Sequence, residues 1–436
     1  MNILRYFVCT LILAAVLTAC LGDDDDTAPI QASEPAGTTV ATHTPTSEED
    51  AEAAETEDEP DDGEGTAAAS ATPGAPQPTP TPMPRTTPTP EVDFGDSSFA
   101  YGWNVGLRGD DENNEHNGRV AELVAESGTG WVRFQMPWFQ MEPADGEWDP
   151  LPFDRMIDAM NAAGLNVLIV VAKAPDWAVS PDPEIHLESM AQFEQFMAFV
   201  AERYRGKVQA WEIWNEQNLA HEWGGYVDVD EYIEMLEAGY NGVKAGDPDA
   251  LVVFGGLTPN GINDPTIAID DFNYLNLAYL RSNGEISQYF DVLGVHANST
   301  HNSPDENYPE PITSGHEGWN DHPSFFFRRV EQLRQVMVDQ GDLDKPVWIT
   351  EFGWTTENQA PGYEYGANNT EEEVAEYLTR GFEIAVDEWG WCTGAFAWNL
   401  NWSTLVPESD EKHPWSALNT DWSPRPQYEA VKNFPK

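Results

Sequence analysis

The sequence predicts an α/β fold, a (β/α)8 TIM barrel preceded by a signal peptide and a disordered linker. Two observations favour the barrel. After residue 92, eight short apolar runs alternate with eight longer amphipathic stretches, as repeated βα units do. No Gly-rich phosphate loop follows the first run, which disfavours a doubly wound sheet. The length of 436 residues fits one such barrel with appendages.

Residues 1–20 have the order of a secretory leader. Arg5 precedes an apolar run over 6–17, which is too short for a comfortable membrane span, and small residues follow. Leu17-Thr18-Ala19-Cys20 resembles the bacterial lipobox. This resemblance implies a lipoprotein signal peptide over 1–20, lipidation of Cys20 and a membrane-anchored, extracytoplasmic protein. The alternative is an ordinary signal peptide that ends nearby and releases a secreted protein.

Residues 21–92 are predicted to be a disordered linker, acidic at first and then rich in Thr and Pro. The barrel domain is expected over 93–436. The three cysteines are Cys9, Cys20 and Cys392, so this domain has one thiol and no internal disulfide.

The formal net charge is −55, and the acidic residues continue through the barrel domain. Such a charge repels nucleic acid and anionic membrane surfaces, which excludes nucleic acid as a partner. It does not identify a substrate, because neutral sugars are indifferent to it. We expect a carbohydrate partner, a membrane contact only through Cys20, and a monomer.

The eight predicted strands are rich in β-branched or aromatic residues and are bounded by Gly, Pro, Asn or Asp. They cover 100–107, 130–136, 166–172, 208–214, 250–256, 290–296, 346–351 and 393–399. The eight predicted helices cover 117–127, 151–163, 188–205, 229–245, 273–282, 325–340, 370–389 and 425–433. The polar segments 256–272 and 297–323 are expected to build cleft walls.

Two of these strands end in glutamate, at Glu216 in Trp214-Asn215-Glu216 and at Glu351 in Ile349-Thr350-Glu351. Reactive groups of a (β/α)8 barrel lie at the carboxyl ends of its strands. Strands four and seven lie nearly opposite, so the two carboxyls could approach to about 5–5.5 Å, the spacing of retaining glycosidases. One would donate a proton while the other attacks. The alternative is a salt bridge at the rim.

The chain resembles the clan A glycoside hydrolases, which place Asn-Glu after strand four and Glu after strand seven. Those positions are Asn215-Glu216 and Glu351 here. Val132-Arg133-Phe134 at strand two and Ala397-Trp398-Asn399 at strand eight also match, so the resemblance spans about 95–436.

The resemblance implies further roles. Arg133 would orient the nucleophile Glu351, and Asn215 would bind the hydroxyl beside the anomeric carbon. Trp398 would form the floor of the sugar pocket. For Arg133 the alternative is an ion pair with Glu212 inside the barrel.

His296 ends strand six, where relatives often have His followed two residues later by Tyr. The second position here is Asn298, so Tyr308 or His301 would have to supply the missing donor to the nucleophile. A buried scaffold role and a sugar contact are both open for His296.

Trp138, Trp177 and Trp354 lie at or just beyond strand ends, where indole faces can stack on sugar rings. We expect them to line the cleft, with core packing as the alternative. Trp103, Trp131 and Trp148 are expected to be structural.

The sequence therefore predicts a retaining hydrolase of β-glycosidic bonds in oligo- or polysaccharides, with Glu216 as acid/base and Glu351 as nucleophile. Metal and serine-hydrolase motifs are absent, so no metal and no cofactor is expected. The alternative is a non-catalytic carbohydrate-binding cell-surface protein on the same scaffold, suggested by Asn298.

Overall fold

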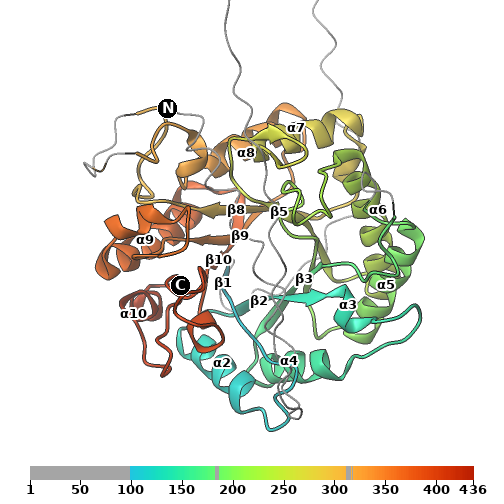
Figure 1. The fold of residues 1–436 in the computed structure, drawn as a ribbon, viewed down its shortest axis with the longest axis horizontal. Coiled ribbons are helices and arrows are strands. Elements are labelled where there is room, and N and C mark those ends of the chain that lie inside the picture. The colour runs from blue at the N-terminus through green and yellow to red at the C-terminus, as the bar shows by residue number, and fades with distance from the viewer. Residues whose placement is uncertain (1–98, 182–185, 311–315, 317) are drawn as a thin grey trace, which may run out of the picture. The chain divides into compact units, whose positions relative to one another are not determined.

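The computed structural model describes residues 99–181, 186–310, 316 and 318–436. The predicted leader, the lipidation site Cys20 and the predicted linker lie outside these residues. Eight parallel strands form a closed barrel in the order β1-β10-β9-β8-β5-β4-β3-β2. Figure 1 shows the strands at the centre with helices around them. The predicted (β/α)8 TIM barrel is confirmed.

The barrel strands lie close to the predicted ranges. They are β1 Ala100–Asn104, β2 Trp131–Pro137, β3 Asn166–Ala172, β4 Ala210–Ile213, β5 Leu251–Leu257, β8 Val292–Asn298, β9 Val347–Gly353 and β10 Cys392–Ala397. Most of their residues are buried. Helices cover one face of these strands and the barrel interior the other, which explains why the sequence reads as continuous apolar runs.

Helices alternate with the strands, and some of them begin at a side chain that caps the first turn. They are α2 Glu115–Glu126, α3 Trp138–Met141, α4 Leu151–Ala162, α5 Met190–Arg203, α6 Val229–Gly246, α7 Asp271–Arg281, α8 Arg329–Asp339, α9 Glu371–Glu383 and α10 Pro426–Asn433. The Asp228 side chain accepts hydrogen bonds from the first turn of α6. Thr370 and Glu373 form a capping box at α9.

Three elements differ from the sequence prediction. The strand predicted over 208–214 ends at Ile213, because Trp214 has a left-handed φ of 71°. The helix predicted from 325 begins at Arg329, after a separate 3₁₀ turn over Pro323–Phe325. The predicted cleft wall 256–272 contains a two-stranded hairpin, β6 Asn263–Asp264 and β7 Ala268–Ile269.

Aromatic rings fill the barrel interior below the strand ends. The rings of Trp131 and Trp348 lie 5.2 Å apart edge to face, and Phe396 lies 5.6 Å from Trp348. A Cβ at Gly102 would lie 2.2 Å from Phe396, so only glycine leaves room for that ring. Because side chains on one strand face recur every second residue, Arg133 lies one layer above Trp131, toward the carboxyl ends.

Within the described ranges, no helix combines the length and apolar character that crossing a bilayer requires.

Candidate active site

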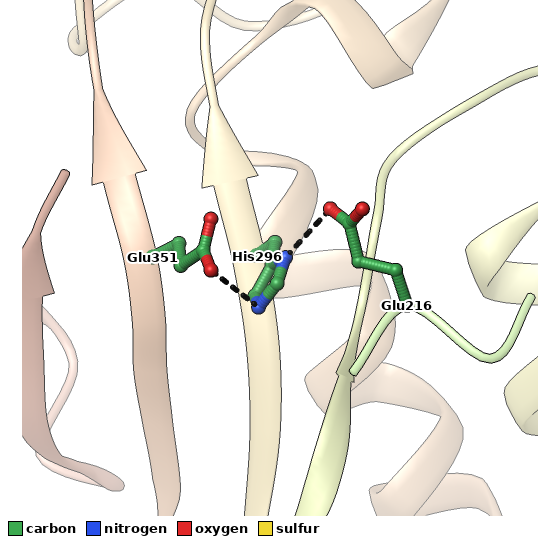
Figure 2. Close-up of side chains that lie close together, drawn as sticks. All are labelled: Glu216, His296 and Glu351. Carbon is green, nitrogen blue, oxygen red and sulfur yellow. Dashed lines mark hydrogen bonds and ion pairs between the residues drawn. The ribbon is translucent and has the colours of Figure 1, made fainter. Parts of the chain in front are cut away.

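Glu216, His296 and Glu351 meet at the carboxyl ends of the barrel strands. His296 lies on β8 between the two glutamates, with Glu351 on β9 and Glu216 just after β4 (Figure 2). The Nδ1 of His296 lies 3.0 Å from Oε1 of Glu216, and its Nε2 lies 3.7 Å from Oε1 of Glu351. One oxygen of each glutamate and a nitrogen of His296 all lie within 4.8 Å of one another. The two predicted carboxyls therefore face each other.

The turn after β4 directs Glu216 into the barrel mouth. Trp214 and Glu216 both have left-handed backbone conformations, with φ of 71° and 50°. Such residues cost about 1–3 kcal/mol each and persist only where their surroundings fix them. The buried Trp214 indole donates to the Glu222 carbonyl at 3.0 Å, and the Glu216 amide donates to the Gly256 carbonyl at 2.9 Å. Tertiary contacts thus hold the turn in place.

Gly256 on β5 makes room for the imidazole of His296. A Cβ at this position would lie 2.3 Å from His296 Nε2. The Gly256 amide also donates to Glu212 Oε1 at 2.9 Å. A larger residue at 256 would push His296 away from both glutamates.

Arg133 joins the nucleophile candidate to the rest of the site. Its side chain is 1% exposed, with Nη1 donating to Glu351 Oε1 at 2.5 Å and Nε donating to Glu212 Oε2 at 2.7 Å. Its Nη2 donates to Asn215 Oδ1 at 2.9 Å. The two partners considered for Arg133 from the sequence, Glu351 and Glu212, are therefore contacted together.

The charges around this network shift several pKa values. Burial opposes the charge of Arg133, but Glu212 and Glu351 together raise the pKa of its guanidinium above the ordinary value. Burial also opposes a charged His296, but Glu351 and Glu216 raise the pKa of the imidazole above 6.5. For Glu216, burial favours the protonated form, but the hydrogen bond and charge of His296 lower its pKa. The pKa values of His296 and Glu216 thus each shift in the direction that favours the charged form.

The predicted tryptophans fall into two groups. Trp398 is half-buried and lies 6.2 Å from the Trp402 ring, and Trp177 is half-buried with its indole donating to the Glu142 carbonyl at 3.1 Å. Both side chains are therefore partly accessible. Trp138 and Trp354 are 0% and 1% exposed.

The expected cleft position of Trp138 and Trp354 is therefore corrected to core packing. Trp138 packs against Phe193 and Phe196 under α5, because the one-turn helix α3 directs its ring inward. Trp354 packs against Phe327, and its indole donates to the Asn302 carbonyl at 2.9 Å.

Asn298 lies at the end of β8, beside Gly353 of β9. Its Oδ1 is buried and has no hydrogen-bond partner among the residues that the structure describes. In the described part of the chain, neither Tyr308 nor His301 interacts with Glu351. Tyr308 lies against Phe326, and His301 lies 5.2 Å from the His316 ring. Arg133, rather than either of these residues, donates to Glu351.

Sequence reasoning missed three residues near Glu216. Thr258, just after β5, hydrogen-bonds the Glu216 carboxylate, and His221 lies close enough to lower the pKa of Glu216. Glu411, on the loop after β10, lies close enough for its charge to be repelled by Glu216. Their positions after β4, β5 and β10 were the available signal. No local motif separates Glu411 from the other acidic residues among the 76 of this chain.

Glu216, His296 and Glu351 are also the group of three in the described residues that could hold a metal ion. Arg133 donates to Glu351, and His296, whose pKa the two glutamates raise against the effect of burial, lies between both carboxylates. The same pair of facing carboxyls can instead divide proton donation and nucleophilic attack.

A family model described as Cellulase (glycosyl hydrolase family 5) matches residues 100–396. Among curated proteins, none matches the chain.

Solved structures share the fold. A family 39 glycoside hydrolase from the gut symbiont Bacteroides cellulosilyticus WH2 aligns with a TM-score of 0.58 at 22% identity, over 76% of this chain and 62% of that one. The GH39 enzyme from Xanthomonas axonopodis pv. citri gives 0.54 at 16% identity, over 80% and 67%. Native xylanase 10B from Thermotoga maritima gives 0.51 at 15% identity, over 77% and 94%. The chain spans about three fifths of the first of these proteins.

Proposed function

Because the chain belongs to the cellulase family, glycosyl hydrolase family 5, we propose that it is a retaining glycosidase of β-linked oligo- or polysaccharides. Glu351 is the nucleophile and Glu216 is the acid/base in this proposal. The observation that carries it is the approach of the two glutamates, which have oxygens within 4.8 Å of each other. This spacing suits direct attack by one carboxylate and leaves little room for an intervening water.

In the first step, a Glu351 oxygen attacks the anomeric carbon while Glu216 gives its proton to the leaving oxygen. The glycosidic bond breaks, and an ester bond forms between the sugar and Glu351. Arg133 Nη1 donates to Glu351 Oε1 and so orients the carboxylate for this attack.

In the second step, Glu216 accepts a proton from water, and the resulting hydroxide equivalent displaces Glu351 from the anomeric carbon. The sugar leaves with its original anomeric configuration. Glu216 is protonated again and ready for the next cycle.

His296 is the neighbouring source of the proton that Glu216 needs. The Nδ1 of His296 lies 3.0 Å from Glu216. Against the effect of burial, the two glutamates raise the pKa of His296, and His296 lowers the pKa of Glu216. A bound sugar excludes water and so favours the neutral pair, imidazole and carboxylic acid, over the ion pair. His296 is a positioning residue in this scheme.

Two more residues suit sugar binding. The Asn215 oxygen is occupied by Arg133, so its Nδ2 remains to donate to the hydroxyl beside the anomeric carbon. The partly accessible Trp398 offers a floor for the sugar, and Trp177 offers a further contact.

The sequence of the leader supports a further proposal on location. We propose that Cys20 is lipidated and holds a monomeric enzyme at an extracytoplasmic membrane face. Nucleic acid has no part in this function, given the net charge of −55.

A non-catalytic carbohydrate-binding protein remains the second candidate. It is favoured by Asn298, whose amide oxygen has no hydrogen-bond partner among the described residues, where similar enzymes often have Tyr.

Chromogenic β-glycosides of glucose, galactose, mannose and xylose separate the two candidates. A glycosidase releases the chromophore, whereas a binder holds the sugar without releasing it. For any glycoside that is cleaved, proton NMR during the first minutes shows the anomer formed. Retention is expected, and inversion would contradict the double displacement.

A further inference from the structure

A charged pair on the loop after β10 lies near the acid/base residue. Glu411 Oε1 and Lys412 Nζ are 3.2 Å apart, and the two side chains are only 13% and 16% exposed. The Glu411 carboxylate lies near enough to Glu216 for their charges to repel. The pair therefore belongs to the mouth of the barrel.

The backbone of this pair is fixed from two directions. Asn358 Nδ2 donates to the Glu411 carbonyl at 2.8 Å, and Asn399 Nδ2 donates to the Lys412 carbonyl at 3.2 Å. Asn399 directly follows Trp398, so the pair is tied to the strand end that carries the proposed sugar floor.

The side chain of Lys412 lies near the Trp402 and Trp398 rings. Its Nζ lies 6.0 Å from the Trp402 ring centroid, and that ring lies 6.2 Å from the Trp398 ring. A sugar on Trp398 would have the charged pair beside it.

The Glu411 carboxylate is mostly buried but accepts few hydrogen bonds. Burial raises its pKa, Lys412 lowers it, and repulsion by Asp410 and Glu216 raises it again, so the pKa lies above its ordinary value. Within the described ranges, Lys412 is the one group that donates to this carboxylate. A carboxylate can accept about four hydrogen bonds. Several acceptor positions are thus open to hydroxyl donors.

The catalytic scheme uses neither Glu411 nor Lys412. A nearly buried ion pair contributes little to folding, because the cost of removing both charges from water offsets their attraction. A ligand-binding role therefore explains this pair better than a stabilising role does.

We infer that Glu411 and Lys412 bind hydroxyl groups of the sugar on Trp398, at ring positions remote from the anomeric carbon, and thereby select among sugars. The inference rests on the proposed glycosidase function. The anomeric carbon lies between Glu216 and Glu351 in that proposal. A carboxylate that accepts from one hydroxyl and an ammonium that donates to its neighbour distinguish sugars by hydroxyl position.

The test is a deoxygenation cycle on the full chain. The 4-nitrophenyl β-glycoside that the wild type cleaves best is compared with its 3-deoxy, 4-deoxy and 6-deoxy forms, or the first two for a xyloside. Removal of the partnered hydroxyl should lower kcat/KM of the wild type about tenfold or more, because the hydrogen bond is to a charged group. In Glu411→Leu, the same removal should change kcat/KM less than about threefold. Lys412→Met should show the same loss of sensitivity at a neighbouring position.

Glu408→Leu is the matched control, because Glu408 is an exposed residue of the same loop. It should keep the wild-type response to every deoxy sugar. If Glu411→Leu lowers kcat/KM equally for all the sugars, the residue is structural and the inference fails.

Equilibrium binding of the corresponding methyl β-glycosides, measured by calorimetry, repeats the cycle without turnover. If Glu411→Leu loses the sensitivity of binding to one deoxygenated position but no sugar is hydrolysed, the proposed function is contradicted and the inference is kept. If the sugars are hydrolysed but Glu411→Leu responds to every deoxygenation as the wild type does, the inference is contradicted and the proposed function is kept. A wild type that neither binds nor cleaves these sugars would overturn both.

Discussion

Nδ1 of His296 lies 3.0 Å from Oε1 of Glu216, and the same ring presents Nε2 toward Glu351 at 3.7 Å. One imidazole thus contacts both carboxylates of the site. Against the effect of burial, the two glutamates raise the pKa of the imidazole, and His296 lowers the pKa of Glu216. The acid/base group has its proton source in direct contact.

Glu351→Ala should lower kcat at least about 10⁴-fold, because the attacking carboxylate is lost while the barrel core is untouched. Azide should restore part of the turnover by occupying the vacated space and attacking the anomeric carbon. The measurement is hydrolysis of a 2,4-dinitrophenyl glycoside with and without azide. Full activity in the variant without azide would rule out Glu351 as the nucleophile.

Glu216→Ala should lower kcat/KM by a factor that depends on the leaving group of the substrate. For a disaccharide, whose leaving oxygen needs a proton, kcat/KM should fall about 10²–10⁴-fold. For a 2,4-dinitrophenyl glycoside, whose leaving group needs none, the fall should be much smaller. Equal losses on both substrates would assign the acid to another residue.

Arg133→Met should destabilise the protein by about 3–5 kcal/mol, because it leaves Glu212 and Glu351 buried without their cation. The measurement is urea unfolding at pH 7. Arg108→Met is the control, since the Arg108 pair with Asp110 is exposed and contributes less than about 1 kcal/mol. Similar losses in both variants would mean that the Arg133 network is not a buried charge cluster.

Trp138→Ala and Trp398→Ala should distinguish a residue that stabilises the core from a residue that binds substrate. Trp138 is fully buried, so its truncation should cost about 3–5 kcal/mol of unfolding free energy. Trp398 is only partly buried, so its truncation should raise KM about tenfold with a smaller loss of stability. Urea unfolding and steady-state kinetics on both variants decide the assignment. A Trp138 variant that is stable but binds poorly would reverse it.

His186 should make the protein less stable in acid. Burial lowers its pKa to about 4, whereas an unfolded histidine titrates near 6.5. Between these values the unfolded chain binds a proton that the folded chain does not, so stability falls as the pH falls. The loss between pH 7 and pH 4.5 should be about 2–3 kcal/mol from this group.

His186→Phe should keep the stacking on Trp223 and remove this part of the pH dependence. Urea unfolding of both proteins at pH 7 and pH 4.5 gives the difference. Parallel pH dependence in the two proteins would show that His186 titrates normally when folded.

The barrel was predictable because its strands are apolar runs between polar ends, and the 166–172 range of β3 was predicted without error. The hairpin β6–β7 was not predictable, because strands of two residues have no periodicity. Glu216 and Glu351 stood out because each is a charge at the end of an apolar strand.

The orientation of side chains near strand ends was harder to predict. Trp138 and Trp398 both follow an apolar strand, yet the former packs under α5 and the latter is only partly buried. That difference depends on the path of the chain after each strand, which short-range patterns do not specify. Glu411 comes from a loop whose conformation depends on hydrogen bonds from Asn358 and Asn399. Neither residue is a near neighbour of Glu411 in the sequence.

The chemical groups are divided between the two halves of the barrel. Arg133 and Glu216 come from the part that ends with α6, whereas His296 and Glu351 come from the part that begins with β5. If the gene were split between these parts, each fragment would carry one of the two carboxyls and neither could turn over substrate. Hydrolysis by the mixed fragments would then report their reassembly, and activity would measure barrel closure directly.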